Sequence, residues 1–179
     1  MRQYRTDGIV LSQKNMFESD KVICIFSLEK GKIQLLARGA NSGKARYGGR
    51  IDVLNHTQFW VYKGKSFDYI SECEVLTSFS NIRKDYDRIT WALYFLDILK
   101  KATSFGQHNQ GLFNLILNAL AYLDKGVDLM ALKAKFHEAF LKVEGLWDDG
   151  CSNLSDTEFQ TKFGDYSGRV IKTPERLCG

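Results

Sequence analysis

The spacing of apolar residues changes once along this chain, near residue 80, and that change limits the architecture more than any other feature. From Gly8 to about Thr77, short apolar or alternating runs are separated by turn residues, which is typical of β-strands. Beyond that point the apolar residues recur every three to four positions, as in packed helices. The sequence therefore predicts an α+β protein with a strand-rich domain at 1–79, an α-helical domain at 80–147 and a tail at 148–179.

The strand-rich part contains five runs, and the third is the most informative. Its alternation places Ile33, Leu35 and Ala37 on one face. The same alternation directs the polar residues Lys32 and Arg38 away from the core. Five short strands joined by tight turns fit a small closed β-barrel. The runs cover residues 9–11, 22–26, 32–37, 57–62 and 67–75.

The helical part carries three apolar stripes, beginning after residues 81, 109 and 128. The first stripe covers most of its helix, so we expect that helix at the centre of a bundle. Periodicity fades in the tail, which is predicted to be irregular. Phe159 and Phe163 in the tail fit either a short hairpin or packing against the helices.

Positive charge is concentrated in the strand-rich part. Residues 1–80 carry twelve Lys or Arg against eight Asp or Glu, whereas the remainder carries thirteen of each. Six basic residues fall between positions 30 and 50 with no acidic residue among them: Lys30, Lys32, Arg38, Lys44, Arg46 and Arg50. Such a patch is typical of a surface that meets a polyanion, because cations that contact phosphates release condensed counterions. A solvated basic loop is the alternative interpretation.

Aromatic residues near this basic run suggest a second mode of nucleic-acid contact. Trp60 and Tyr62 share one face of the fourth run, and Tyr47 lies in the glycine-rich segment 39–50. That segment is predicted to be a mobile loop. Exposed aromatic rings stack on unpaired bases, so the three residues are candidate base contacts. The alternative is that the helical domain covers Trp60 and Tyr62, since large aromatic side chains seldom remain exposed without a partner.

No motif in the sequence predicts an active site. Segment 39–45 fails as a phosphate-binding loop because Gly39 and Gly43 are too close, and Ala45 stands where a magnesium-binding hydroxyl is required. Neither a G-x-S-x-G elbow nor an H-E-x-x-H pair occurs. The sequence predicts a binding protein with no catalytic residue and no cofactor. With no apolar segment long enough for a membrane span or a signal peptide, a cytoplasmic location is expected.

A metal site is not predicted either. The four cysteines lie far apart without a C-x-x-C pair, and no histidine has a second ligand at i+3 or i+4. Cys24 and Cys73 are interpreted as buried apolar residues. A nonlocal site that combines Cys151, Cys178 and a histidine stays open.

Several short motifs, in order over about residues 4–147, resemble the RecO family of bacterial recombination mediators. The barrel region contributes Gly8-Ile9-Val10-Leu11, Glu18-Ser19-Asp20, Phe26, Gly31-Lys32, Ala37-Arg38-Gly39-Ala40 and Tyr62-Lys63-Gly64. The helical region contributes Leu112-Phe113 and Phe136-His137-Glu138-Ala139-Phe140. Many relatives also carry paired C-x-x-C zinc ligands after the third helix. This chain departs from that pattern.

The resemblance implies an N-terminal OB-fold that binds single- and double-stranded DNA and anneals complementary strands. It also implies work with RecR and single-stranded DNA-binding protein to load the recombinase, in the bacterial cytoplasm near the nucleoid and away from any membrane. The expected DNA-binding residues are Lys32, Arg38, Lys44, Arg46, Tyr47, Arg50, Trp60 and Tyr62. The alternative function is a protein-interaction adaptor whose barrel never engages nucleic acid.

Overall fold

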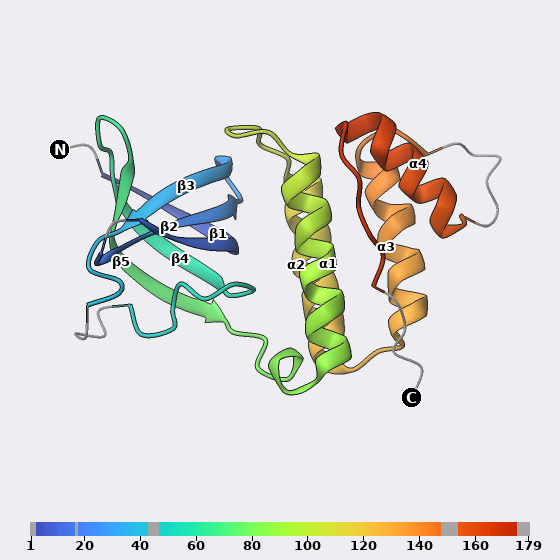
Figure 1. Cartoon of the computed structure of the whole chain (residues 1–179), viewed down its shortest axis with the longest axis horizontal. Coiled ribbons are helices and arrows are strands. Elements are labelled where there is room, and N and C mark those ends of the chain that lie inside the picture. Colours follow the sequence, from blue (N-terminus) through green and yellow to red (C-terminus); the bar gives the residue numbers. More distant parts are fainter. Residues whose placement is uncertain (1–2, 17, 43–46, 148–153, 175–179) are drawn as a thin grey trace. The chain divides into compact units, whose positions relative to one another are not determined.

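The computed structural model describes residues 3–16, 18–42, 47–147 and 154–174, and all of the strands in it precede the helices (Figure 1). Five strands come first: β1 (Gln3–Met16), β2 (Asp20–Ser27), β3 (Gly31–Ala37), β4 (His56–Tyr62) and β5 (Asp68–Thr77). A short 3₁₀ turn, Ile82–Lys84, leads to α1 (Tyr86–Ala102), α2 (Gln110–Lys125), α3 (Leu129–Val143) and α4 (Asp156–Ser167). None of the helices described has the length and apolar character that crossing a membrane requires.

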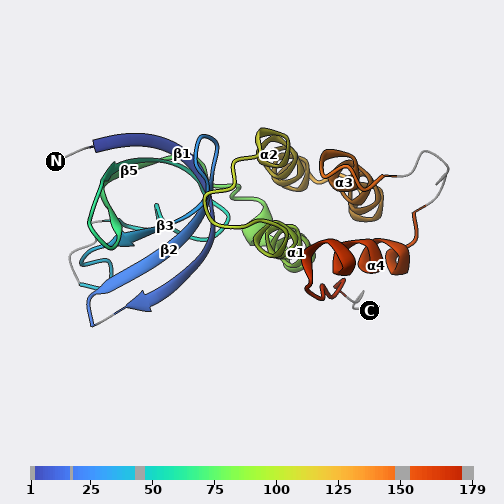
Figure 2. The ribbon, with the colours of Figure 1, turned by 90° about the horizontal axis from the view of Figure 1, so that it is seen from above.

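The five strands close into a barrel in the order β1-β2-β3-β5-β4, which confirms the predicted OB-fold architecture. Every pairing is antiparallel except that of β3 with β5, where Leu35 and Leu36 meet Asp68 and Tyr69 in parallel. In Figure 2 the strands curve around a common interior. The inward residues of β3 are those predicted from its alternation, with Leu35 and Ala37 buried and Ile33 packed beside them.

Contacts group residues 1–78 with residues 104–113 as one compact unit, and residues 79–103 with 114–179 as the other. The connection between α1 and α2 is therefore part of the barrel unit. Its Gly106 N–H donates to the carbonyl of Lys32 at 2.9 Å, and Phe113 stacks on Phe26 with ring centroids 6.3 Å apart. The predicted boundary between residues 79 and 80 stays a prediction.

The second unit is held together by aromatic packing between its helices. Phe95 of α1 stacks on Phe136 of α3 at a centroid distance of 4.2 Å. Phe140 of α3 contacts both Phe159 and Phe163 of α4, and all three are fully buried. Part of the tail predicted to be irregular is thus a helix that packs back on α3, and Figure 2 shows α4 from the side while α1 to α3 are seen nearly end-on.

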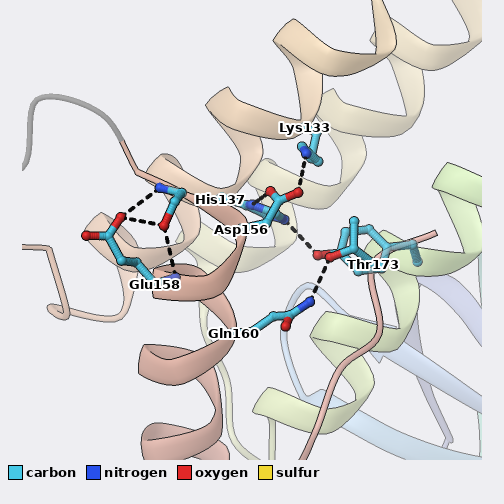
Figure 3. A network of polar contacts seen from close by, with 8 residues as sticks. Lys133, His137, Asp156, Glu158, Gln160 and Thr173 are labelled. Atoms are coloured by element: carbon cyan, nitrogen blue, oxygen red, sulfur yellow. Dashed lines mark hydrogen bonds and ion pairs between the residues drawn. The ribbon is translucent and has the colours of Figure 1, made fainter. Parts of the chain in front are cut away.

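A polar network that includes the buried side chains of Lys133 and His137 joins α3 to α4 (Figure 3). The Lys133 ammonium, on a residue only 7% exposed, donates to the Asp156 carboxylate at 2.7 Å. His137 hydrogen-bonds the Tyr94 hydroxyl through Nε2 at 2.8 Å and stacks on Phe159. Burial of the imidazole lowers the pKa of His137 from 6.5 to about 3, against a smaller opposing effect of Asp156. His137 is therefore neutral in the folded protein at physiological pH.

This buried histidine predicts a loss of stability in mild acid. The unfolded chain takes up the proton below pH 6.5 and the native state does not, so stability is complete above pH 6.5 and falls towards pH 3. His137 lowers the free energy of unfolding by at most about 1.4 kcal/mol per pH unit, which amounts to roughly 2 kcal/mol at pH 5. His137→Phe keeps an aromatic ring but has no titrating group. We therefore expect its free energy of unfolding, measured with urea, to change less between pH 7 and pH 5 than that of the wild type. An unchanged slope would contradict the assignment.

Candidate nucleic-acid interface

The glycine-rich segment 39–50 carries part of the basic run, and its two described ends, residues 39–42 and 47–50, are hydrogen-bonded to neighbouring parts of the barrel. At the first end, the Gly39 N–H donates to the Asp20 carboxylate at 2.8 Å and the Asn41 N–H donates to the Ser19 carbonyl at 2.9 Å. At the second end, the Thr57 hydroxyl donates to the Arg50 carbonyl at 2.9 Å. Backbone amides and carbonyls that find such partners hold their segment in place. The loop therefore leaves and rejoins the barrel at fixed points.

Among the described residues, the predicted cations Lys32, Arg38 and Arg50 lie in three different surroundings. Lys44 and Arg46 lie outside the described residues. Arg38 is exposed, with its guanidinium carbon 4.5 Å from the centre of the Tyr69 ring. Arg50 is also exposed, but it lines a pocket of about 500 Å³ together with Glu72 and Glu74, whose carboxylates offset its charge.

Lys32 is not an exposed phosphate contact, which corrects the sequence prediction. The residue is only 4% exposed, because segment 104–113 covers this end of β3. Its ammonium lies 5.0 Å from the centre of the Phe105 ring, within range of a cation–π interaction. The alternation correctly placed Lys32 outside the barrel core but gave no sign of the covering segment.

Tyr47 is not available for stacking on bases, which is a second correction. The residue is 3% exposed and belongs to the apolar core of the barrel, with Ile51, Phe59 and Val61 in the same cluster. Its hydroxyl donates to the carbonyl of Ile70 at 3.3 Å. The side chain closes the barrel interior from the loop and fixes the position of the described loop residues that follow.

Trp60 and Tyr62 lie on the outside of β4, and both are half-buried. The Arg5 guanidinium carbon lies 5.3 Å from the centre of the Trp60 ring, and Tyr62 packs on Tyr69 with centroids 5.5 Å apart. Together with Arg38 over Tyr69, these residues form what we call the cation–aromatic face: Arg5, Arg38, Trp60, Tyr62 and Tyr69. Arginine planes and aromatic rings side by side are the groups that hold phosphates and stacked bases.

Two members of the cation–aromatic face, Arg5 and Tyr69, were missed by the sequence prediction. Tyr69 directly faces Tyr62 across the β4–β5 pair, and Arg5 directly faces Trp60 across β1–β4. The position of Tyr69 could have been predicted from the hairpin around Lys63-Gly64-Lys65. A strand that follows a short turn runs back beside the preceding strand, which here carries Tyr62. The pairing of β1 with β4 has no comparable local signal.

The cations of this face are free of carboxylate partners within the described part of the chain. No ion pair involves Arg5 or Arg38 there, whereas the ion pairs described in the helical unit include Lys101 with Asp97 and Lys142 with Glu138. Unpaired guanidinium groups remain available to phosphates. Glu72, which faces Trp60 across the β4–β5 pair, is the nearest acidic neighbour in register.

Metal ligands do not gather in the part of the chain that the structure describes, since no three His, Cys, Asp or Glu residues there are placed to hold an ion. Cys24 and Cys73 are buried and form no disulfide, in agreement with their interpretation as apolar residues. Cys151 and Cys178 lie outside the described residues, so the nonlocal cysteine site stays an open prediction.

These observations define the chain as an OB-barrel protein with a helical second unit. Comparison with family models narrows the class. Residues 1–79 match the model described as "Recombination protein O N terminal", and residues 83–146 match "Recombination protein O C terminal". The chain belongs to the RecO family of DNA repair proteins.

Individual relatives agree with this assignment. The "DNA repair protein RecO" of Desulforamulus reducens is 34% identical over 149 residues, which is 83% of this chain and 58% of the relative. The protein of the same name from Acetivibrio thermocellus is 33% identical over 167 residues, 91% of this chain and 66% of the relative. That from Listeria monocytogenes is 30% identical over 169 residues, again 66% of the relative. The chain thus spans less than two thirds of the length of these curated relatives.

Proposed function

We propose that this chain is a non-enzymatic mediator of recombinational DNA repair that binds single- and double-stranded DNA and anneals complementary strands. The observation that carries the proposal is the cation–aromatic face, where Arg5 and Arg38 lie over Trp60 and Tyr69 without carboxylate partners among the described residues. Family membership supports the same role, since the relatives are named DNA repair proteins.

The chemistry of annealing follows from the two kinds of group on this face. Guanidinium groups neutralise phosphates of two strands and so reduce the repulsion between them. Half-buried aromatic rings hold unpaired bases, each stacked base contributing about 1 to 3 kcal/mol. Because phosphates carry no base identity, we expect little sequence preference.

We propose RecR and single-stranded DNA-binding protein as partners, with the recombinase engaged indirectly, in the cytoplasm near the nucleoid. An apolar pocket of about 400 Å³ between α2 and α3 supports a protein-binding role for the helical unit. Leu115, Ala119, Leu132 and Phe136 line it, with the exposed ring of Tyr122 at its edge. An apolar concavity of this kind suits an apolar segment of a protein partner.

Salt dependence gives the first test. If about four to six phosphates are neutralised, the logarithm of duplex affinity should fall with the logarithm of salt concentration at a slope of roughly −4 to −5. Single strands should give a shallower slope, because they release fewer counterions per phosphate. Fluorescence anisotropy between 50 and 300 mM salt, about the range in which phosphate contacts weaken measurably, provides the measurement. A slope near zero would rule out phosphate contacts as the main source of affinity.

Annealing itself separates the proposal from the adaptor alternative. Complementary oligonucleotides coated with single-stranded DNA-binding protein are mixed with the chain, and duplex formation is followed by fluorescence quenching. Acceleration supports the mediator role. Binding of RecR without any DNA binding or annealing would favour the adaptor instead.

A further inference from the structure

A small pocket opens beside the cation–aromatic face, at the end of the barrel where β1 begins. It has a volume of about 220 Å³, and its lining residues are Tyr4, Lys30, Lys63 and Asp68. Lys30 comes from the β2–β3 hairpin and Lys63 from the β4–β5 hairpin, so two separate turns each contribute a lysine to the lining of one pocket. At about 30 Å³ per water molecule, the pocket has room for a small polyatomic anion.

The carboxylate of Asp68, which lines the pocket, accepts two hydrogen bonds from groups other than the lysines. The Tyr4 hydroxyl donates to Oδ2 of Asp68 at 2.7 Å, and the Gly64 N–H donates to Oδ1 at 3.1 Å. Burial and the contact with Asp68 raise the pKa of Tyr4 well above its usual value, so the phenol remains a donor at every physiological pH. Asp68 is therefore turned towards Tyr4 and the β4–β5 turn.

Both lysines remain available as a result. Among the described residues, neither Lys30 nor Lys63 forms an ion pair, although a carboxylate lines the same pocket. The Lys30 ammonium is positioned 4.3 Å from the centre of the Tyr4 ring, where the ring face attracts it without using its hydrogen-bond donors. Two lysine side chains that line one concavity and form no ion pair among the described residues are a site for an anion with several oxygens.

We infer that this pocket binds a phosphate monoester, namely the terminal phosphate of a DNA strand whose body lies on the cation–aromatic face. The inference rests on the proposed function, since the strand must first be held by the barrel. A terminal phosphate carries close to two negative charges at neutral pH and presents three free oxygens, which matches two ammonium groups. An internal phosphodiester carries one charge and has chain on both sides, so it enters a closed pocket less readily.

The test compares one single-stranded oligonucleotide in three forms, with a 5′-phosphate, with a 3′-phosphate and with hydroxyl groups at both ends. The label is internal, and affinity is measured by anisotropy at pH 7.5. One phosphorylated form should bind roughly fivefold to tenfold more tightly than the hydroxyl form, as expected for two partly exposed ion pairs. The preference should shrink below pH 6, where the monoester gains a proton.

Variants assign the preference to the pocket. Lys30→Gln combined with Lys63→Gln should abolish it. Lys65→Gln, which removes one positive charge from the same turn as Lys63 but outside the pocket lining, should retain it. Millimolar inorganic phosphate should reduce the preference without displacing the hydroxyl strand. Tight binding of inorganic phosphate to the protein without DNA would instead identify a free-phosphate site and overturn the inference.

The two proposals fail in different ways. Equal affinity for all three oligonucleotides would overturn the terminal-phosphate pocket while leaving DNA binding intact. Absence of binding to every oligonucleotide would overturn the proposed function itself. Circular single-stranded DNA has no terminal phosphate to fill the pocket. The double lysine variant should therefore lose less affinity for it than for the preferred phosphorylated linear strand.

Discussion

Replacing Tyr47 with alanine is expected to lower the free energy of unfolding by about 3 to 5 kcal/mol, the usual cost of removing a large aromatic side chain from a core. The ring lies inside the barrel at 3% exposure, packed in one cluster with Phe59 and Val61. Its loss leaves a cavity and removes the hydroxyl that hydrogen-bonds the carbonyl of Ile70. Urea denaturation followed by circular dichroism measures the change.

A conservative variant separates this structural role from a role in stacking on bases. Tyr47→Phe keeps the ring and removes only the hydrogen bond to Ile70, so we expect a loss of about 1 kcal/mol and unchanged DNA affinity. If Tyr47→Ala proved fully stable but bound single strands more weakly, the ring would have to be exposed, contrary to the position described here.

Neutralising Arg5 and Arg38 together, as Arg5→Gln with Arg38→Gln, should weaken DNA binding strongly. At 0.1 M salt, the loss of one phosphate contact lowers the base-10 logarithm of the association constant by about 0.7 for single strands and about 0.9 for duplexes. The double variant should therefore bind roughly 25-fold more weakly to single strands and roughly 60-fold more weakly to duplexes. Its salt slope should become shallower by about 1.4 and 1.8, respectively. Anisotropy at several salt concentrations measures both quantities.

A matched control tests whether position or net charge is responsible. Lys84→Gln with Lys125→Gln removes the same charge from two exposed residues of the helical unit. This variant should keep its affinity within about twofold, because neither lysine belongs to the cation–aromatic face. Equal losses in both double variants would mean that overall charge, and not the cation–aromatic face, governs binding.

The sequence predicted the barrel and the three longer helices because each rests on local periodicity. Alternation in β3 identified the inward residues Leu35 and Ala37 correctly. It failed for Lys32 because period-two patterning tells which face a residue occupies but not what covers that face. The cover is supplied by segment 104–113, which is far along the chain.

Two other differences have local causes. The glycine-rich composition around Tyr47 suggested a mobile loop, yet a single aromatic residue inserted into the barrel fixes the chain there. Helix α4 has no long apolar stripe, but the position where it begins could have been predicted from the sequence. Ser155 and Glu158 have the spacing of a capping box, and the structure shows both of its reciprocal hydrogen bonds.

Because segment 104–113 belongs with the strands, the polypeptide passes from one unit to the other near residue 78, returns near 103 and leaves again near 113. A proteolytic nick near residue 78 leaves segment 104–113, which packs with the strands, on the same fragment as the helices. The two units therefore cannot be exchanged between homologues as simple cassettes. A chimera that keeps a native barrel must carry this connecting peptide from the same parent as the strands.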